Sequence, residues 1–296
     1  MFGYARSSIL VLTAAHCAYN PNNPNLSVIL GQNQSAYFNV GSAAYPVASA
    51  QVYPDWMAQD WSQPQLAPNL AAGRDIALLQ LSTPVLDVAP ALLMTGANEV
   101  GRIGDYVGFG NTGNGRSRKR SFDGIKRGAQ NVVDSAGFVD PNGARWLDTL
   151  LVADFDSPNQ LSNRIGSPTP LPLECSVAPI DSGGGLFIDG YLAGVTSFMM
   201  DTSGNSYLAD YSDLMASTRV SSFVPWIAPI TGLAPTVASS ASLSGSGTVN
   251  NLNSVSALAA SSQQNQQERI PEPTISIGLL LVSGLMALFR FKLSSK

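Results

Sequence analysis

One histidine, one aspartate before an apolar strand and one serine in a glycine-rich turn carry the chemistry of this sequence. The 296-residue chain has a single histidine, His16, so a mechanism that needs imidazole as a base has one candidate. Neutral imidazole takes the proton of a serine hydroxyl, which alone is a poor nucleophile. Asp75 precedes the pattern IALLQL, and Ser182 lies in DSGG. The three residues together could supply a base, a carboxylate that orients it, and a nucleophile.

Taken singly, each motif also has a structural explanation. A lone histidine beside a cysteine is often a core residue, an aspartate before a strand is often a turn residue, and DSGG is a common loop. Their order along the chain, His, Asp and then Ser, favours the catalytic interpretation, because other folds carry the same triad in other orders. The sequence therefore predicts nucleophilic catalysis by His16, Asp75 and Ser182, with Gly-rich backbone around the serine.

The chain resembles the trypsin-like (chymotrypsin-fold) serine proteases over roughly residues 8–228. Besides the motifs around His16 and Ser182, three segments carry the resemblance: 106–110 (YVGFG), 194–198 (GVTSF) and 217–227 (STRVSSFVPWI). They are similar to the strand that opens the second barrel, the strand beside the specificity pocket, and the closing strand with its C-terminal helix. The resemblance implies an all-β fold of two antiparallel six-stranded β-barrels and endopeptidase activity on peptide or protein substrates.

Composition agrees with a turn-rich β protein. Charged residues make up 12% of the chain, against about 25% in a usual protein, and there are 27 Gly and 19 Pro residues. The net charge of −4 argues against nucleic acid as a partner, and we expect no cofactor and no metal. The resemblance places Cys17 and Cys175, the only two cysteines, in different barrels, so we expect both to be unpaired.

The nucleophile loop departs from the family pattern at Ile180. The resemblance implies that the backbone N–H groups of Ile180 and Ser182 form the oxyanion hole, and the family usually has glycine at the first position. A β-branched residue reaches that backbone conformation only at a cost of about 1–3 kcal/mol. Either Ile180 bears this strain, or the peptide flips and one donor is lost. Asp181 is expected to pair with an internal group or with a segment missing here.

The same resemblance places the substrate pocket at Ser176, Ser197, Phe198 and Met199. Ser176 would lie near its base, and the other three residues would form one wall. Met199 stands where the family often has glycine, and its bulk should shorten the pocket and disfavour large side chains. No acidic residue is clearly placed to receive Arg or Lys, so the sequence does not name a substrate.

Composition divides the chain into three parts. Residues 1–230 are predicted to form the protease domain, 231–270 a flexible linker of small and polar residues without periodicity, and 271–296 a C-terminal signal. Few residues precede His16, where the family has two or three strands. We therefore expect an N-terminally truncated first barrel, from a truncated or misannotated start or from a naturally shortened barrel.

The C-terminal part resembles the PEP-CTERM sorting signal of Gram-negative bacteria. Pro271, Glu272 and Pro273 precede an apolar run over 274–289 and a basic tail. The run is shorter than the ~20 residues of a usual spanning helix, but the basic end favours a membrane segment with a cytoplasmic C-terminus; a core helix is the alternative. The resemblance implies an exosortase-type partner, transient anchoring in the inner membrane by 274–289, and a secreted or cell-surface mature protein.

Two functions from different classes follow from these observations. The first is a secreted or surface-sorted serine endopeptidase. The alternative is a catalytically weak protease homologue that serves as a surface or extracellular-matrix binding protein. The alternative rests on Ile180 and on the few residues ahead of His16.

Overall fold

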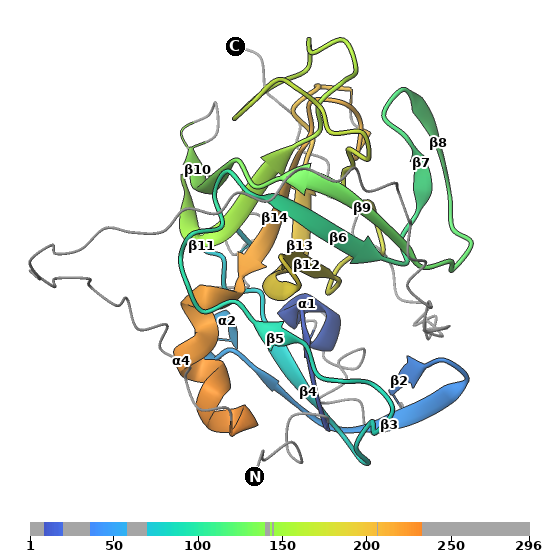
Figure 1. The fold of residues 1–296 in the computed structure, drawn as a ribbon, viewed down its shortest axis with the longest axis vertical. Coiled ribbons are helices and arrows are strands. Elements are labelled where there is room, and N and C mark those ends of the chain that lie inside the picture. Colours follow the sequence, from blue (N-terminus) through green and yellow to red (C-terminus); the bar gives the residue numbers. More distant parts are fainter. Residues whose placement is uncertain are drawn as a thin grey trace, which may run out of the picture.

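The structure is a computed structural model, and it describes residues 9–19, 36–57, 70–139, 143, 145–205 and 207–232. These residues are mostly β, with one longer helix at their C-terminal end (Figure 1). In this part of the chain, no helix is both long and apolar enough to cross a membrane. The sorting signal at 271–296, its apolar run and nearly all of the predicted linker lie outside the described residues.

The first sheet has four antiparallel strands in the order β1-β4-β3-β2. Their bounds are β1 Leu10–Thr13, β2 Tyr37–Val40, β3 Ala43–Val52 and β4 Ala77–Leu81. Two one-turn helices accompany them, α1 (Ala15–Ala18) directly after β1 and α2 (Pro54–Met57) after β3. The fully buried Trp56 of α2 packs with Ala15 and Ala18 of α1, so the core of this half holds α1 in place.

The second sheet has eight strands, of which seven follow the order β10-β11-β14-β13-β12-β6-β9 and β5 pairs in parallel with β13. Their bounds are β5 Leu92–Leu93, β6 Ile103–Gly108, β9 Arg127–Val132, β10 Ser135–Val139, β11 Arg145–Asp154, β12 Gly185–Ile188, β13 Tyr191–Met200 and β14 Leu214–Arg219. A hairpin of β7 (Thr112–Asn114) and β8 (Ser117–Ser121) stands apart. Helix α4 (Val220–Thr231) follows β14 and ends at Gly232, whose φ of 68° is left-handed.

The strand counts differ from the expected six in each barrel. The described part of the first half contributes four strands. The second sheet has eight because β5, in the segment between the two halves, pairs in parallel with the first two residues of β13. Of the segments expected as strands, 106–110 begins in β6, which ends at Gly108, and 194–198 lies in β13; 217–227 spans the end of β14 and most of α4. Those local predictions are confirmed.

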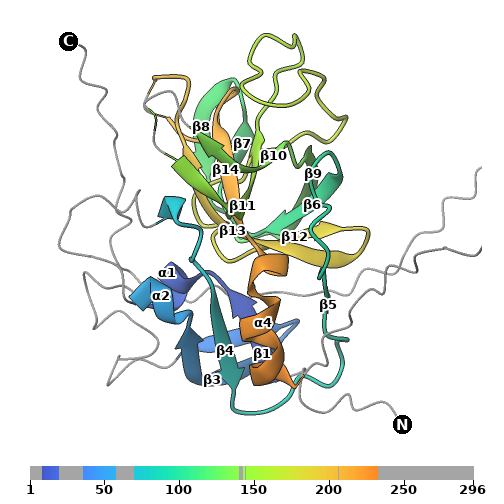
Figure 2. The ribbon, with the colours of Figure 1, turned by 90° about the vertical axis from the view of Figure 1, so that its left-hand side faces the viewer.

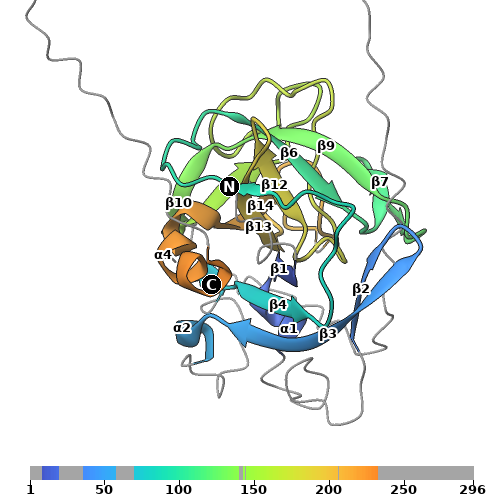
Figure 3. The same ribbon diagram turned by 60° about the horizontal axis from the view of Figure 1, so that its bottom comes forward.

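One apolar cluster joins the two sheets and α4. It contains Ile76 from the first half, Val195 from β13, and Phe223 and Ile227 from α4, all buried. Tyr53, at the end of β3, packs edge-on against Phe223 with ring centroids 4.9 Å apart. Figures 2 and 3 show α4 beside the first sheet while its preceding strand belongs to the second. The cluster therefore fixes how the ends of the two sheets face each other.

Candidate active site

Strand pairing in the first sheet brings His16 to Asp75. β1 and β4 are antiparallel, with Thr13 opposite Ala77. His16 is the second residue of α1, three residues after Thr13, and Asp75 is two residues before Ala77, so both lie at the same end of the strand pair. His16 Nδ1 lies 2.6 Å from Asp75 Oδ2, and the backbone N–H of His16 donates to Asp75 Oδ1 at 2.8 Å. The carboxylate thus fixes both the ring and its backbone.

Asp75 is fully buried and receives a third donor from the second sheet. The hydroxyl of Ser197 donates to Asp75 Oδ2 at 2.6 Å. The register of β13 against β14 shifts between Thr196 and Phe198, so Ser197 lies in a bulge, and bulges re-aim side chains. Thr218 Oγ1 donates to the carbonyl of Asp75 at 3.0 Å. The second sheet therefore holds the carboxylate that orients His16.

The charges of this pair favour an imidazolium beside a carboxylate. Burial disfavours the charged imidazole, but the negative charge and hydrogen bond of Asp75 outweigh it and raise the pKa of His16 well above 6.5. Burial likewise opposes ionisation of Asp75, but the charge and hydrogen bonds of His16, with the Ser197 hydroxyl, lower its pKa below the usual value. The His16 side chain remains 28% exposed, so it can meet a substrate.

The loop that carries Ser182 lies against the end of β1 and against α1. A Cβ on Gly183 would stand 2.4 Å from Thr13 Oγ1, and the φ of Gly183 is +83°, so only glycine fits there. The thiol of Cys17 donates to the carbonyl of Ser182 at 3.6 Å. Ser182 is exposed, and its hydroxyl makes no hydrogen bond within the part of the chain that the structure describes. In enzymes without bound substrate, the hydrogen bond between a catalytic serine hydroxyl and its histidine is often long or poorly aligned.

Ile180 adopts the left-handed backbone conformation that glycine favours. Its φ is +84°, and the N–H of Asp181 donates to the carbonyl of Ala178 at 3.0 Å, closing a turn over residues 178–181. With Pro179 at the second position and positive φ at the third, this is a type II turn. Of the two outcomes left open by the sequence, Ile180 bears the strain and the peptide is not flipped.

The backbone N–H groups around Ser182 fall into two sets, those that donate to a described residue and those that do not. Those of Asp181, Gly183 and Gly184 donate to backbone carbonyls at 2.8–3.0 Å. Those of Ile180 and Ser182, the two predicted oxyanion donors, have no acceptor among the described residues. Two free donors on either side of an engaged one suit a developing oxyanion.

Asp181 pairs with an internal group, the first of the two alternatives that the sequence allowed. Its Oδ1 accepts from the N–H of Gly110 at 2.7 Å and its Oδ2 from the N–H of Ala178 at 2.8 Å. A Cβ on Gly108 or Gly110 would lie within 2.7 Å of the carboxyl group, which explains why both positions of the glycine-rich strand lack side chains. Burial raises the pKa of Asp181, and the backbone donors offset part of that rise.

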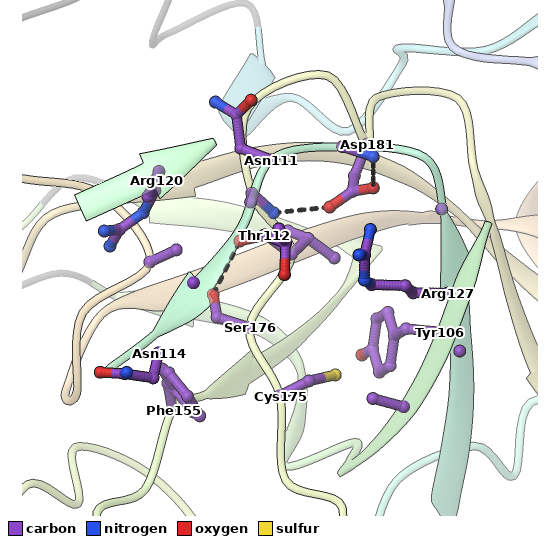
Figure 4. A pocket seen from close by; sticks show the side chains of 18 of the residues that line it. Tyr106, Asn111, Thr112, Asn114, Arg120, Arg127, Phe155, Cys175, Ser176 and Asp181 are labelled. Carbon is purple, nitrogen blue, oxygen red and sulfur yellow. Dashed lines mark hydrogen bonds between the residues drawn. The ribbon is translucent and has the colours of Figure 1, made fainter. Parts of the chain in front are cut away.

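A cavity of about 260 Å³ opens behind Asp181 (Figure 4). Its lining includes Tyr106, Arg127, Cys175 and Ser176, but neither His16 nor Ser182. Burial raises the pKa of the Cys175 thiol to about 12, so Cys175 is uncharged at neutral pH. Neither Cys175 nor Cys17 is in a disulfide, as predicted.

The four predicted pocket residues do not line one cavity. Ser176 lines the cavity behind Asp181, and the Ser197 hydroxyl points to Asp75 instead of forming a wall. Phe198 packs edge-on against Trp146 at 4.8 Å, while Met199 packs against the core cluster of the second sheet. The bulge at Ser197 alters the facing of this strand, and the assignment of the four residues to a substrate pocket stays a prediction. Sequence alone gave no signal for that bulge.

The comparison with protein families identifies the family of this chain. The family model described as Trypsin matches residues 4–157, just over half of the chain, so the chain belongs to the trypsin family of serine proteases. The match includes His16 and Asp75 and ends before Ser182.

Among the solved structures that match is neuropsin, a serine protease expressed in the limbic system of mouse brain. It is 19% identical, the alignment covers 76% of this chain and 86% of neuropsin, and the TM-score is 0.49. The search of curated proteins found no significant match.

Proposed function

We propose that the protein is a serine endopeptidase that uses Ser182 as nucleophile, His16 as general base and Asp75 to orient His16. The observation that carries the proposal is the buried Asp75 carboxylate at 2.6 Å from His16 Nδ1, next to a serine loop with two unengaged N–H groups. A carboxylate on Nδ1 fixes the tautomer whose Nε2 can accept the serine proton. No cofactor is needed for this chemistry.

The proposed reaction has two halves. Ser182 Oγ attacks the peptide carbonyl carbon while its proton passes to His16 Nε2, and the N–H groups of Ile180 and Ser182 bind the oxyanion. The intermediate collapses, and His16 returns the proton to the leaving amine. A water molecule, deprotonated by His16, then attacks the acyl-enzyme, releasing the carboxylic acid and restoring the Ser182 hydroxyl.

A fluorophosphonate probe tests the nucleophile directly. We expect the probe to label the purified, folded chain and to leave Ser182→Ala unlabelled. The exposed side chain of Ser182 makes the substitution mild, so circular dichroism should show an unchanged fold. Wild-type protein that is folded but never labels would refute the endopeptidase proposal.

Ile180→Gly is expected to stabilise the fold with little effect on kcat. Glycine relieves the strain of about 1–3 kcal/mol at φ +84°, less about 0.5–1 kcal/mol for its larger chain entropy when unfolded. Because the turn already has the type II geometry, the Ile180 N–H should not move, and kcat should change less than about threefold. Urea unfolding and peptide hydrolysis measure the two effects.

Ile180→Ala is the matched control, since it removes the β-branch but keeps a Cβ at positive φ. It should give a smaller gain in stability than glycine. A rise in kcat of tenfold or more in Ile180→Gly would show that the wild-type loop spends most of its time flipped in solution, contrary to this expectation.

The alternative, a catalytically weak homologue that binds a surface or matrix partner, is favoured by one observation. Ile180 holds the oxyanion turn in a strained conformation, and strain lowers the population of an ordered loop. A labelled Ser182 with measurable peptide hydrolysis excludes this alternative. Folded protein that binds matrix components but does not label supports it.

We also propose that residues 231–270 are a linker and that 271–296 are a sorting signal processed by an exosortase-type enzyme, leaving the protease domain secreted or at the cell surface. The support is the order of Pro271-Glu272-Pro273, apolar run and basic tail. Mass spectrometry of the mature protein should find a C-terminus near residue 271. An intact Lys296 terminus on secreted material would contradict the proposal.

A further inference from the structure

The candidate base and the candidate nucleophile lie on different halves of the molecule, so contacts between the halves decide how they meet. His16 belongs to α1 beside the first sheet, and Ser182 lies in the loop that leads into β12 of the second. That loop packs against the end of β1, because a Cβ on Gly183 would overlap Thr13 Oγ1. The segment 13–17 of the first half is therefore the surface on which the nucleophile loop rests.

The side chain of Cys17 links this segment to the nucleophile itself. Its thiol donates to the backbone carbonyl of Ser182, with Sγ 3.6 Å from the oxygen, across 165 residues of sequence. A thiol is a weak donor, but such bonds recur in proteins. Holding the Ser182 carbonyl restricts rotation about the Cα–C bond of that residue. The thiol therefore helps to fix where the Ser182 side chain stands relative to α1.

The same side chain acts on His16, its neighbour in α1. Burial lowers the pKa of His16, while Asp75 and, after it, Cys17 raise that pKa by their charge and hydrogen bonding. A thiol sulfur accepts hydrogen bonds weakly as well as donating them. One side chain thus interacts with both the candidate base and the backbone of the candidate nucleophile.

The link requires a thiol that is not in a disulfide, since a disulfide sulfur has no hydrogen to donate. Cys17 is free and exposed, so reagents in solution can reach it. Cys175, the other free cysteine, is partly buried, and burial raises the pKa of its thiol to about 12. A reagent that needs a thiolate should therefore modify Cys17 well before Cys175.

We propose that Cys17 is a positioning residue for the endopeptidase reaction, and that its reduced thiol holds the Ser182 carbonyl so that the serine hydroxyl stands within reach of His16. This rests on the proposed endopeptidase function and adds a residue to its site. Cys17 is not offered as a nucleophile, because it acts through Ser182 and His16. A group attached to its sulfur removes the donor and should slow the reaction.

Replacing Cys17 tests the role of the donor. In Cys17→Ala we expect kcat to fall about three- to tenfold, the effect of one lost hydrogen bond of this kind. KM should stay within about twofold, because the contact is not made to substrate. Cys17→Ser keeps a donor and should retain more kcat than Cys17→Ala. The acid limb of kcat/KM should move to lower pH in Cys17→Ala, since one group that raises the pKa of His16 is gone.

Cys175→Ala is the matched control, because it removes the other thiol of the chain. Cys175 packs against the core cluster of the second sheet, so this variant can lose stability. Its kcat and its acid limb should match those of the wild type. Thermal unfolding checks that each variant is folded before the rates are compared.

Methyl methanethiosulfonate tests the same donor without a substitution. The Cys17 thiolate attacks the divalent sulfur of the reagent, methanesulfinate leaves, and Cys17 carries a methylthio group in a mixed disulfide, its proton having passed to solvent. The rate of fluorophosphonate labelling at Ser182 should fall about threefold or more, and dithiothreitol should restore it. The labelling rate of Cys17→Ser should not respond to the reagent.

The failures of the two proposals can be told apart. Folded wild-type protein that fluorophosphonate never labels, and that hydrolyses no peptide, refutes the endopeptidase function and this inference with it. Labelling at Ser182 combined with wild-type kcat and an unmoved acid limb in Cys17→Ala refutes the positioning role alone. That role is also refuted if Cys17→Ser is no more active than Cys17→Ala, if Cys175→Ala loses as much kcat, or if methylthio-modified wild type labels at the unmodified rate.

Discussion

Asp75→Asn is expected to lower kcat about 10⁴-fold without unfolding the protein. Asp75 accepts from His16 Nδ1 and from the Ser197 hydroxyl through one oxygen, and from the His16 N–H through the other. An asparagine keeps one acceptor but presents an NH₂ group where the second was. If that group faces the ring, His16 takes the tautomer with a proton on Nε2, which cannot accept the proton of Ser182. Steady-state hydrolysis and the rate of fluorophosphonate labelling both measure the loss.

The pH dependence adds a second readout for Asp75. His16 must be neutral to act as a base, and its pKa is raised well above 6.5 by Asp75. Wild-type kcat/KM should therefore fall as the pH drops through that raised pKa. In Asp75→Asn the acid limb should move to lower pH, because the carboxylate charge is gone. Ser197→Ala, which removes only one of the donors to Asp75, is the control and should lose far less activity.

Retention of a tenth or more of wild-type kcat in folded Asp75→Asn would contradict the assigned role. An unmoved acid limb would do the same, since a carboxylate that does not set the pKa of His16 does not orient it through a charged contact.

Arg219→Met is expected to destabilise the fold by about 3–5 kcal/mol. Arg219 Nε and Nη2 donate to the two oxygens of Glu99 at 3.0 and 2.5 Å, and Ser221 Oγ donates to Glu99 at 2.7 Å. Glu99 is fully buried, so removing the guanidinium leaves an uncompensated charge in the interior. The pair ties the segment before β6 to the junction of β14 and α4. Urea unfolding at pH 7 measures the effect.

The loss in Arg219→Met should shrink as the pH falls toward 4. In the wild type, burial opposes ionisation of Glu99, but Arg219 and Ser221 hold its pKa below the usual value. The Glu99–Arg219 pair therefore contributes its full stability above the pKa that Glu99 has in the unfolded chain, and this contribution is lost as the pH falls through the lowered pKa of the folded state. In the variant, burial without a cation raises the pKa of Glu99. The variant therefore gains stability on acidification while the wild type loses it.

Arg102→Met is the matched control. Arg102 pairs with Asp189, but the two side chains are 31% and 70% exposed, and such pairs contribute about 0–1 kcal/mol. Equal losses in the free energy of unfolding for Arg102→Met and Arg219→Met would show that the buried Glu99–Arg219 pair stabilises the fold no more than the exposed Arg102–Asp189 pair.

The family of the protein could be predicted from short stretches of sequence. The residues around His16, the DSGG turn at Ser182 and the segment 106–110 are each weak signals alone, but their order along the chain can be read without knowing any tertiary contact. The glycines of that strand illustrate the point. Gly108 and Gly110 are visible in the sequence, although their purpose, making room for the carboxylate of Asp181, is a contact across 71 residues.

The conformation of the turn over residues 178–181, the proposed oxyanion turn, was decided by tertiary structure. From the sequence, Ile180 could bear the strain or flip its peptide. Asp181 is anchored to Gly110 and to Ala178 on both oxygens, and those anchors hold the turn so that Ile180 keeps a φ of +84°. An isoleucine has no such local preference, so no inspection of neighbouring residues would have given this result.

The pocket was the part least accessible to sequence. A single-residue bulge at Ser197 sends that hydroxyl to Asp75, and the same shifted register places Met199 opposite Met215 of β14. Side-chain facing in a strand alternates with every residue, so one extra residue changes which side chains share a face. The sequence determines which residues are present in such a strand; the pairing of β13 with β14 decides which of them meet, because register is set by contacts between distant segments.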